Sequence, residues 1–310
     1  MSNSYKEESR AAAQADGGPG WTKSGAALVS IVSNSTLVLL KLAAGFLTGS
    51  VAIMSEAVHS GLDLVAALMA YVSVRVAERP PDSHHPFGHG KAEFLAALFE
   101  GLLIMGAGGL IVRQAARGFF KPEPMPELGW GALVMLISAL VNILVSRGLF
   151  RVGQRVESAA LVADAWHLRT DVYTSLGVFA ALAGIMIGAH LAPDLDLLFL
   201  DPLCALIVAV MILKAGAALS WEAVGQLLDH SLKPDELNLI VRHIQALAPQ
   251  IKGYGAIKTR RSGSCRHIYM ELRVNAGMSV EAGHSLGVEL VKSLQEHFPD
   301  SQISFHLDPG

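Results

Sequence analysis

Two histidine–aspartate pairs stand inside the most apolar parts of this sequence. His59 and Asp63 are four residues apart, and His167 and Asp171 repeat that spacing later in the chain. On a helix this spacing puts both side chains on one face, about 6 Å apart along the axis. Ionisable groups at membrane depth are costly and usually functional. Two imidazoles and two carboxylates form a ligand set that suits tetrahedral Zn²⁺.

These residues could instead be polar groups that hold helices together. Two identical motifs with the same direction favour the metal site over that alternative. Oxygen ligands alone would suit Mg²⁺, Ca²⁺ or Mn²⁺, and thiolates would suit Cu⁺, but neither cysteine lies near a motif. Glu56 and Asp164 flank the four residues, and we expect them to orient the histidines or to line the entrance.

The composition is that of an integral membrane protein. The chain has 310 residues, of which 52% are hydrophobic and 16% charged, and its mean hydropathy is +0.42. Soluble domains carry about a quarter of charged residues. The net charge of −3 argues against nucleic acid as a partner. Two cysteines cannot build a disulfide framework.

Six apolar stretches are long enough to cross a bilayer. They cover roughly residues 26–47, 51–76, 94–116, 128–150, 159–191 and 203–219. The fifth begins with polar residues, so its first turns are predicted to extend into solvent as a helix. We assign residues 1–22 to a disordered leader, 23–221 to the membrane domain and 222–310 to a soluble domain.

The soluble domain is predicted to have the order αββαβ. Helical periodicity covers residues 234–247 and 280–298, and strand patterns cover 255–261, 267–274 and 302–307. This order indicates a small α+β domain whose antiparallel sheet is covered on one face by helices.

The charges of the short loops predict the orientation in the membrane. The loop after the second span has Arg75, Arg79 and Lys91. The loop after the fourth span has Arg147, Arg151 and Arg155. The connection between the fifth and sixth spans has no Lys or Arg, which places both termini in the cytoplasm. Arg113, Arg117 and Lys121, at the far end of the third span, argue for the opposite orientation.

A histidine-rich loop follows the second span. Asp82 is followed by His85 three residues later and by His89 seven residues later, in a segment stiffened by prolines. This spacing supports a second metal site. The alternative is a solvated loop with incidental histidines, and His84 has no assigned role.

Several longer motifs resemble those of the cation diffusion facilitator family of metal–proton antiporters, above all its zinc members. They are the paired His-x-x-x-Asp motifs, His85 to Glu93, Asp164 to Asp171, and Phe305 to Pro309. The resemblance implies six membrane helices, a cytoplasmic ferredoxin-like domain and a homodimer. It also implies that the four membrane residues form the transport site and that Asp82, His85 and His89 bind metal.

In the soluble domain the resemblance points to Glu271, His284, His306 and Asp308. Their spacing alone is that of ordinary surface polarity, but zinc members of the family hold a binuclear site at the dimer interface. Gly255 and Glu271 stand where two histidines of that site are expected, which leaves a single weaker site or another regulatory metal as alternatives. His267 is a nearby candidate without a family counterpart.

The resemblance further implies an interlocking salt bridge between Lys91 and Asp229 at the dimer interface. Unrelated charges that anchor helix ends are the alternative. The remaining histidines, His190, His230, His243 and His297, show no pattern and are interpreted as ordinary side chains.

These features predict a secondary active transporter of the cytoplasmic membrane, not an enzyme. It exports a divalent metal, Zn²⁺ first, by alternating access in exchange for protons. Cd²⁺, Co²⁺, Ni²⁺ and Fe²⁺ are alternative substrates because similar ligands accept them. A membrane metalloenzyme would need a motif such as His-Glu-x-x-His, which the sequence lacks, and a metal sensor would not need four ligands inside the membrane.

Overall fold

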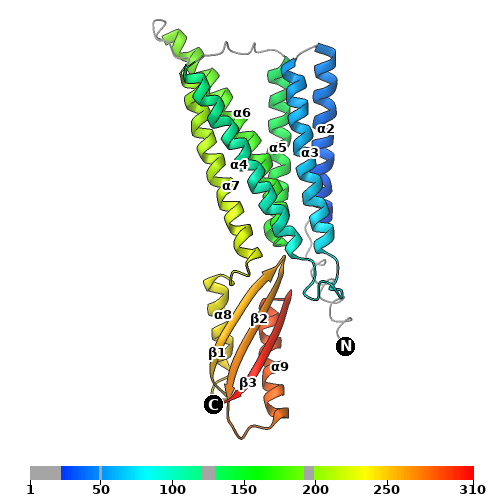
Figure 1. Ribbon diagram of the computed structural model, residues 1–310, viewed down its shortest axis with the longest axis vertical. Coiled ribbons are helices and arrows are strands. Elements are labelled where there is room, and N and C mark those ends of the chain that lie inside the picture. Colours follow the sequence, from blue (N-terminus) through cyan, green and yellow to red (C-terminus); the bar gives the residue numbers. More distant parts are fainter. Residues whose placement is uncertain (1–21, 49–50, 121–129, 192–198) are drawn as a thin grey trace. The chain divides into compact units, whose positions relative to one another are not determined.

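The chain forms two compact units, which we describe separately. The computed structural model describes residues 22–48, 51–120, 130–191 and 199–310 (Figure 1). The membrane unit comprises the described parts of Trp21–Glu78 and Ala92–Val224. The C-terminal unit comprises Gly225–Gly310 together with the histidine-rich loop, Arg79–Lys91. The predicted leader lies outside the described residues, apart from its last position.

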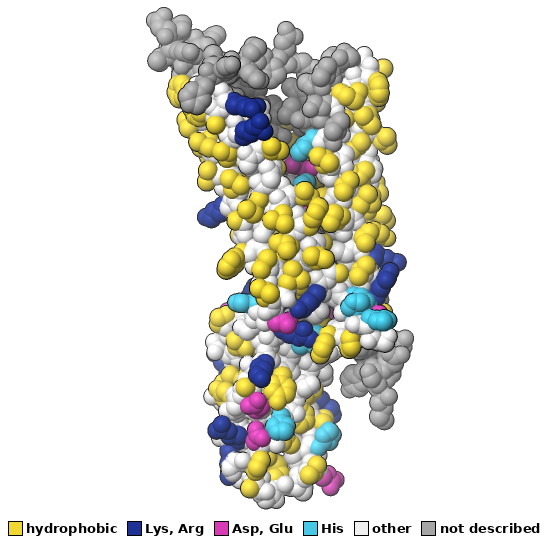
Figure 2. Space-filling model, in the orientation of Figure 1, with side chains coloured by type: hydrophobic (Ala, Val, Ile, Leu, Met, Phe, Trp, Pro, Cys, Tyr) yellow, Lys and Arg dark blue, Asp and Glu magenta, His cyan; other side chains and the backbone are white. Residues whose placement is uncertain are grey.

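Among the described residues, six long helices build the membrane unit, as predicted. They are α2 (Lys23–Thr48), α3 (Val51–Ala77), α4 (Lys91–Phe120), α5 (Trp130–Arg155), α6 (Ala159–Leu191) and α7 (Leu200–Leu227). All but α6 contain, within the described residues, an apolar stretch that is long enough to cross a membrane. Large apolar side chains such as Leu39, Leu62 and Leu110 are well exposed, and Figure 2 shows hydrophobic side chains over much of the visible face of this unit. Such a surface suits lipid.

The first turns of α6 are buried, which corrects the prediction that they extend into solvent. Ala160, Leu161, Ala163 and Asp164 are all at most 1% exposed. Small side chains let neighbouring helices approach closely, and here they pack against residues of α2, α3 and α5. The polar residues of this segment therefore face the inside of the helix bundle.

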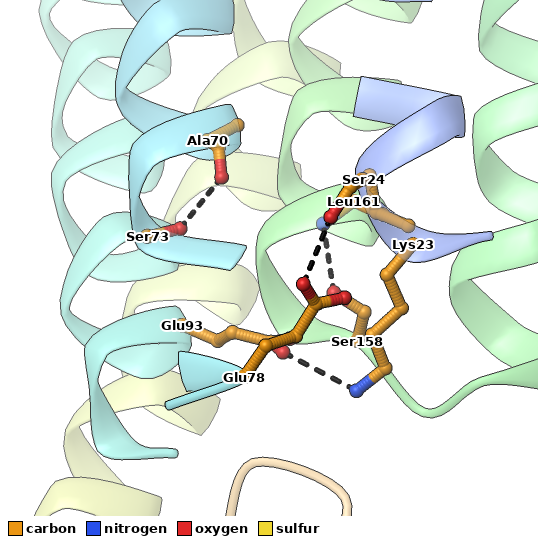
Figure 3. A network of polar contacts seen from close by, with 8 residues as sticks. All are labelled: Lys23, Ser24, Ala70, Ser73, Glu78, Glu93, Ser158 and Leu161. Atoms are coloured by element: carbon orange, nitrogen blue, oxygen red, sulfur yellow. Dashed lines mark hydrogen bonds and ion pairs between the residues drawn. The ribbon is translucent and has the colours of Figure 1, made fainter. Parts of the chain in front are cut away.

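A polar network joins the ends of four helices (Figure 3). The buried carboxylate of Glu93, in the first turn of α4, accepts hydrogen bonds from Lys23 Nζ (3.3 Å) and Ser158 Oγ (2.5 Å). Ser158 precedes α6, and its Oγ also accepts from the backbone N–H of Leu161 at 3.5 Å. Beside it, Ser24 Oγ donates to Glu78 at 2.9 Å. These contacts fix the starts of α2, α4 and α6 and the end of α3 to one another.

The C-terminal unit has the predicted order of elements. They are α8 (Pro234–Ala246), β1 (Ile251–Ser262), β2 (Cys265–Val274), α9 (Val280–His297) and β3 (Ser301–Pro309). Alternate residues of β2, from Ile268 to Val274, form one core with the buried faces of α8 and α9. The helices therefore cover one face of the sheet, as predicted.

The sheet is mixed, and not antiparallel as predicted. The strand order is β1-β2-β3, with β1 antiparallel and β3 parallel to β2. A tight turn at Gly263, whose φ is 63°, joins β1 to β2. Between β2 and β3 the chain runs back through α9. This helix carries the chain from the C-terminal end of β2 back to the level of its N-terminal end. The next strand, β3, therefore runs parallel to β2.

Candidate metal sites

Three of the four intramembrane residues converge between α3 and α6. His59 and Asp63 of α3 and Asp171 of α6 each offer a ligand atom, and these atoms lie within 4.8 Å of one another. His167, one turn before Asp171 on α6, joins the group through Asp63, because its Nε2 lies 3.1 Å from Asp63 Oδ1. The two sequence motifs therefore meet across one helix pair, and we call these four residues the membrane quartet.

A cavity of about 100 Å³ adjoins the membrane quartet. It is lined by Asn34, Leu37, Lys41, His59, Ser60, Asp63, Ser138, Ala139, Asn142, Asp171, Thr174 and Ser175. His59 is exposed to it, whereas Asp63 is only 6% exposed. In Figure 2, histidine and acidic side chains are visible in a recess between hydrophobic surfaces of this unit. A polar cavity of this volume has room for an ion with a few water molecules.

Glu100 is a neighbour of the membrane quartet that the sequence analysis missed. It lies on α4, is fully buried, and its Oε2 is 3.8 Å from Nδ1 of His167. It is the one acidic residue of the third predicted span. An acidic residue inside an apolar span usually has a function, so the sequence did contain an indication of its role. Asp164, which was predicted to flank the quartet, is also buried. The side chain of Glu56 lies outside the described parts of the chain.

The histidine-rich loop brings together the three residues that its spacing singled out. Ligand atoms of Asp82, His85 and His89 lie within 4.8 Å of one another. Asp82 Oδ1 is 3.5 Å from His85 Nδ1, and Asp82 Oδ2 is 3.4 Å from His89 Nε2. Asp82 also accepts backbone hydrogen bonds from His85 (2.7 Å) and His84 (2.9 Å), and these lower the pKa of its carboxyl group. The carboxylate is thus held ionised between two imidazoles.

Lys91 and Asp229 form an ion pair within the C-terminal unit. Lys91 Nζ lies 2.9 Å from Asp229 Oδ1 and also donates to the backbone oxygen of Leu227 at 3.0 Å. Arg260 shares the same oxygen of Asp229 at 3.3 Å. The hydrogen bond from Lys91 is the main cause that lowers the pKa of Asp229. The second cation means that this pair is part of a three-residue cluster.

The four soluble-domain candidates do not form a cluster within one chain. Among the described residues, none of them belongs to a group of three convergent metal ligands. His306 and Asp308, both well exposed, pair with each other at 3.2 Å. His284 is exposed on α9. As a site, these residues remain a prediction.

Glu271 has a structural partner in the neighbouring strand. Its Oε2 accepts from the backbone N–H of Ala256 at 3.0 Å, where a bulge in β1 sets Gly255 and Ala256 opposite Glu271. A Cβ atom on Gly255 would lie only 2.6 Å from Glu271 Oε2. Glycine at 255 therefore leaves room for the Glu271 side chain to reach the backbone of the neighbouring strand.

Two family models match the chain almost end to end. The cation efflux transmembrane domain covers residues 27–228, and the cytoplasmic domain of cation efflux proteins covers residues 232–310. Among curated relatives, the uncharacterised transporter sll1263 of Synechocystis is 34% identical over 283 residues, which are 91% of this chain and 89% of the relative. The cation-efflux pump FieF of Citrobacter koseri is 32% identical over 284 residues, 92% of each chain. FieF of Klebsiella pneumoniae is 33% identical over 286 residues, again 92% of each.

Proposed function

Since the chain belongs to the cation efflux family, the cation diffusion facilitators, we propose that it exports a divalent transition metal, Zn²⁺ first, in exchange for protons. It is a multi-pass membrane transporter with a C-terminal cytoplasmic domain. The proposal includes the identity of the ion and its exchange for protons. It also includes the location in the inner membrane and the cytoplasmic position of both termini.

The observation that carries the proposal is the convergence of His59, Asp63 and Asp171 at the cavity. Imidazole and carboxylate ligands in a small site favour Zn²⁺ and its neighbours over Mg²⁺ or Ca²⁺. The ligands come from two separate helices, so a relative movement of α3 and α6 would change the coordination. A transporter needs this property, because its site must release the ion as well as bind it.

The contact between His167 and Asp63 supports coupling to protons. At 3.1 Å, a ring N–H of His167 donates to the carboxylate of Asp63. A metal ion that binds both residues must replace that proton, because metals bind the deprotonated ligands. Protons that return from the other side would restore the hydrogen bond and displace the ion. We propose that this competition is the exchange step.

The histidine-rich loop and the dimer complete the proposal. Asp82, His85 and His89 offer a second metal site, which we assign to delivery of the ion or to shaping of the loop. We propose a homodimer because residues 232–310 match the cytoplasmic domain of cation efflux proteins. In that dimer, Lys91 and Asp229 would act as the interlock, and a second copy would have to complete any site at Glu271, His284, His306 and Asp308.

Transport into sealed liposomes tests the proposal. Purified protein is reconstituted with a metal dye and a pH dye inside, and Zn²⁺, Cd²⁺, Co²⁺, Ni²⁺, Fe²⁺ and Mg²⁺ are added in turn. We expect Zn²⁺ uptake with simultaneous proton release from the lumen, and no uptake of Mg²⁺. Metal uptake without any proton movement would overturn the exchange. Binding without uptake of any ion would point instead to the alternatives, a metal sensor or a metalloenzyme.

A His59→Asp variant identifies the selectivity site in the same assay. An additional carboxylate makes the ligand set richer in oxygen, and we expect the preference to move toward harder ions such as Mn²⁺. An unchanged order of ions would show that the membrane quartet does not select the substrate.

A further inference from the structure

Two histidines from different helices meet on the outer face of the C-terminal unit. His243 lies in the last turn of α8, and His297 is the last residue of α9. Their ring centroids are 4.8 Å apart, and the rings are inclined by 67°. The two residues are 54 positions apart in the chain, so no sequence pattern connects them.

Ser293 fixes the ring orientation of both histidines. His297 Nδ1 lies 3.4 Å from the backbone oxygen of Ser293. A carbonyl oxygen can only accept, so this nitrogen carries the proton. His243 Nδ1 lies 3.0 Å from Ser293 Oγ. When that hydroxyl donates its hydrogen to the backbone oxygen of Leu290 at 3.0 Å, its own oxygen accepts from His243 Nδ1.

The same tautomer follows for both rings. With both Nδ1 atoms protonated, each neutral ring keeps a free lone pair on Nε2. A histidine that binds metal through one nitrogen typically donates the other N–H to a protein oxygen, which fixes its tautomer and orientation. His243 and His297 have this arrangement.

The surroundings favour the neutral, ligating form of His243. Partial burial lowers its pKa, and the neighbouring His297 lowers it further. The charge of the neighbouring Glu296 acts in the opposite direction and is the smallest of these three effects. His297 and Glu296 are exposed, so an ion from solution can reach them.

We propose that His243 and His297, oriented by Ser293, form a binding site for a divalent transition metal such as Zn²⁺, Ni²⁺ or Cu²⁺. The site is separate from the membrane quartet, the histidine-rich loop and the four soluble-domain candidates. An ion bound there joins the last turns of α8 and α9 and holds these two helices together. Its occupancy is independent of whether the protein transports Zn²⁺.

Hydrogen exchange with mass spectrometry on the full chain in detergent tests this site. The probe is Zn²⁺ itself, and peptide resolution separates its effect here from that at other sites. We expect Zn²⁺ to slow exchange in peptides that cover the last turns of α8 and α9. This effect should disappear in both His243→Gln and His297→Gln. It should remain in His230→Gln, a matched change of another exposed histidine in the same unit.

Ser293→Ala tests the orienting role. Loss of the hydroxyl leaves both histidines in place but frees the ring of His243, and outer-shell partners of this kind are worth about 10–100-fold in metal affinity. We expect the Zn²⁺ concentration for half-maximal protection to rise by about that factor. The proposal is overturned if Zn²⁺ gives no local protection in the parent protein. It is also overturned if Zn²⁺ still protects these peptides in His243→Gln or in His297→Gln, or if His230→Gln abolishes the protection. An unchanged Zn²⁺ affinity in Ser293→Ala would overturn the orienting role of Ser293.

Discussion

His167 Nε2 on α6 lies 3.1 Å from Asp63 Oδ1 on α3, so the histidine of one motif is bonded to the aspartate of the other. Within each motif the two residues share a helix face and cannot separate. Across the helix pair, the same residues can move apart when α3 and α6 shift. This contact therefore makes the membrane quartet sensitive to movement of the two helices, as does the convergence of Asp171 with His59 and Asp63.

Asp63→Asn should abolish the exchange of metal for protons. The amide keeps the size of the side chain and can still bond to His167, but it offers no carboxylate to a metal ion. We expect Zn²⁺-driven proton movement in liposomes to fall to the level of protein-free vesicles. Asp300→Asn, at an exposed position of the C-terminal unit, is the control and should behave like the parent. Undiminished exchange in Asp63→Asn would remove this residue from the site.

The histidine-rich loop offers a matched pair of variants. His85 and His84 are neighbours and both exposed, but only His85 belongs to the cluster with Asp82 and His89. His85→Ala should lose one equivalent of weakly bound Zn²⁺ in equilibrium dialysis. His84→Ala should lose none, because its contribution to Asp82 is a backbone N–H that alanine retains. Equal losses in both variants would mean that the loop binds metal only by its general histidine content.

Much of this fold is predictable because local patterns determine it. The six apolar stretches and the order αββαβ follow from hydrophobic periodicity and length. The parallel pairing of β3 with β2 was not predicted, although the helix predicted between these two strands favours a parallel crossover. The burial of the first turns of α6 was missed because polar residues such as Asp164 suggested solvent, although alanines at 160, 163 and 165 allow close helix packing.

The site residues also differ in whether the sequence alone reveals them. His59 with Asp63, and Asp82 with His85 and His89, are visible in the sequence because their members are close in the chain. Glu100 and the pair His243–His297 are not, because only the fold brings them to their partners. The match of Gly255 to Glu271 is likewise a relationship between strands, which becomes visible once the register is known.

Glu93→Ala should destabilise the membrane unit strongly. Glu93 is 1% exposed and bonds to Lys23 and Ser158, so its removal leaves a partly buried cation without this carboxylate. Breaking a buried pair in this way costs about 3–5 kcal/mol. Ser158→Ala should cost about 0.5–2 kcal/mol, the usual value of a helix N-cap. Thermal unfolding in detergent measures both, and a smaller effect for Glu93 than for Ser158 would contradict this order.

The ion pair of Lys91 and Asp229 should contribute only modestly to stability. Asp229 is about half exposed, and exposed pairs are worth up to about 1 kcal/mol. Because the pKa of Asp229 is lowered in the folded state, its contribution is present above the usual carboxyl range and is lost as the pH falls through the lowered value.

A double-mutant cycle with Lys91→Met and Asp229→Asn measures the coupling between these two residues. A charge swap is less suitable, because a lysine at 229 would stand beside Arg260. We expect a small coupling in unfolding experiments and a larger one in transport, since the proposed role is to link parts of a dimer. No coupling in transport would favour simple anchoring of helix ends.

His267 should make the C-terminal unit less stable in mild acid. It is 8% exposed, its ring stands edge-on to Phe87 with centroids 5.5 Å apart, and burial lowers its pKa, as does the nearby Arg260. The unfolded chain therefore binds a proton more readily than the folded one. Stability is full above the ordinary histidine pKa of about 6.5 and falls as the pH drops through that value toward the lowered one.

The His267→Gln variant removes this titration and should flatten the pH dependence. We expect the urea midpoint of the C-terminal unit, measured by proteolysis of the full chain, to change less between pH 7.5 and pH 5.5 than in the parent. His230→Gln provides the control, because His230 is exposed and its loss leaves the buried titration in place. The same slope in His267→Gln and in the parent would show that another group causes the acid sensitivity. In that case the contact of Phe87 with His267 would hold the histidine-rich loop to β2 whether the imidazole is neutral or protonated.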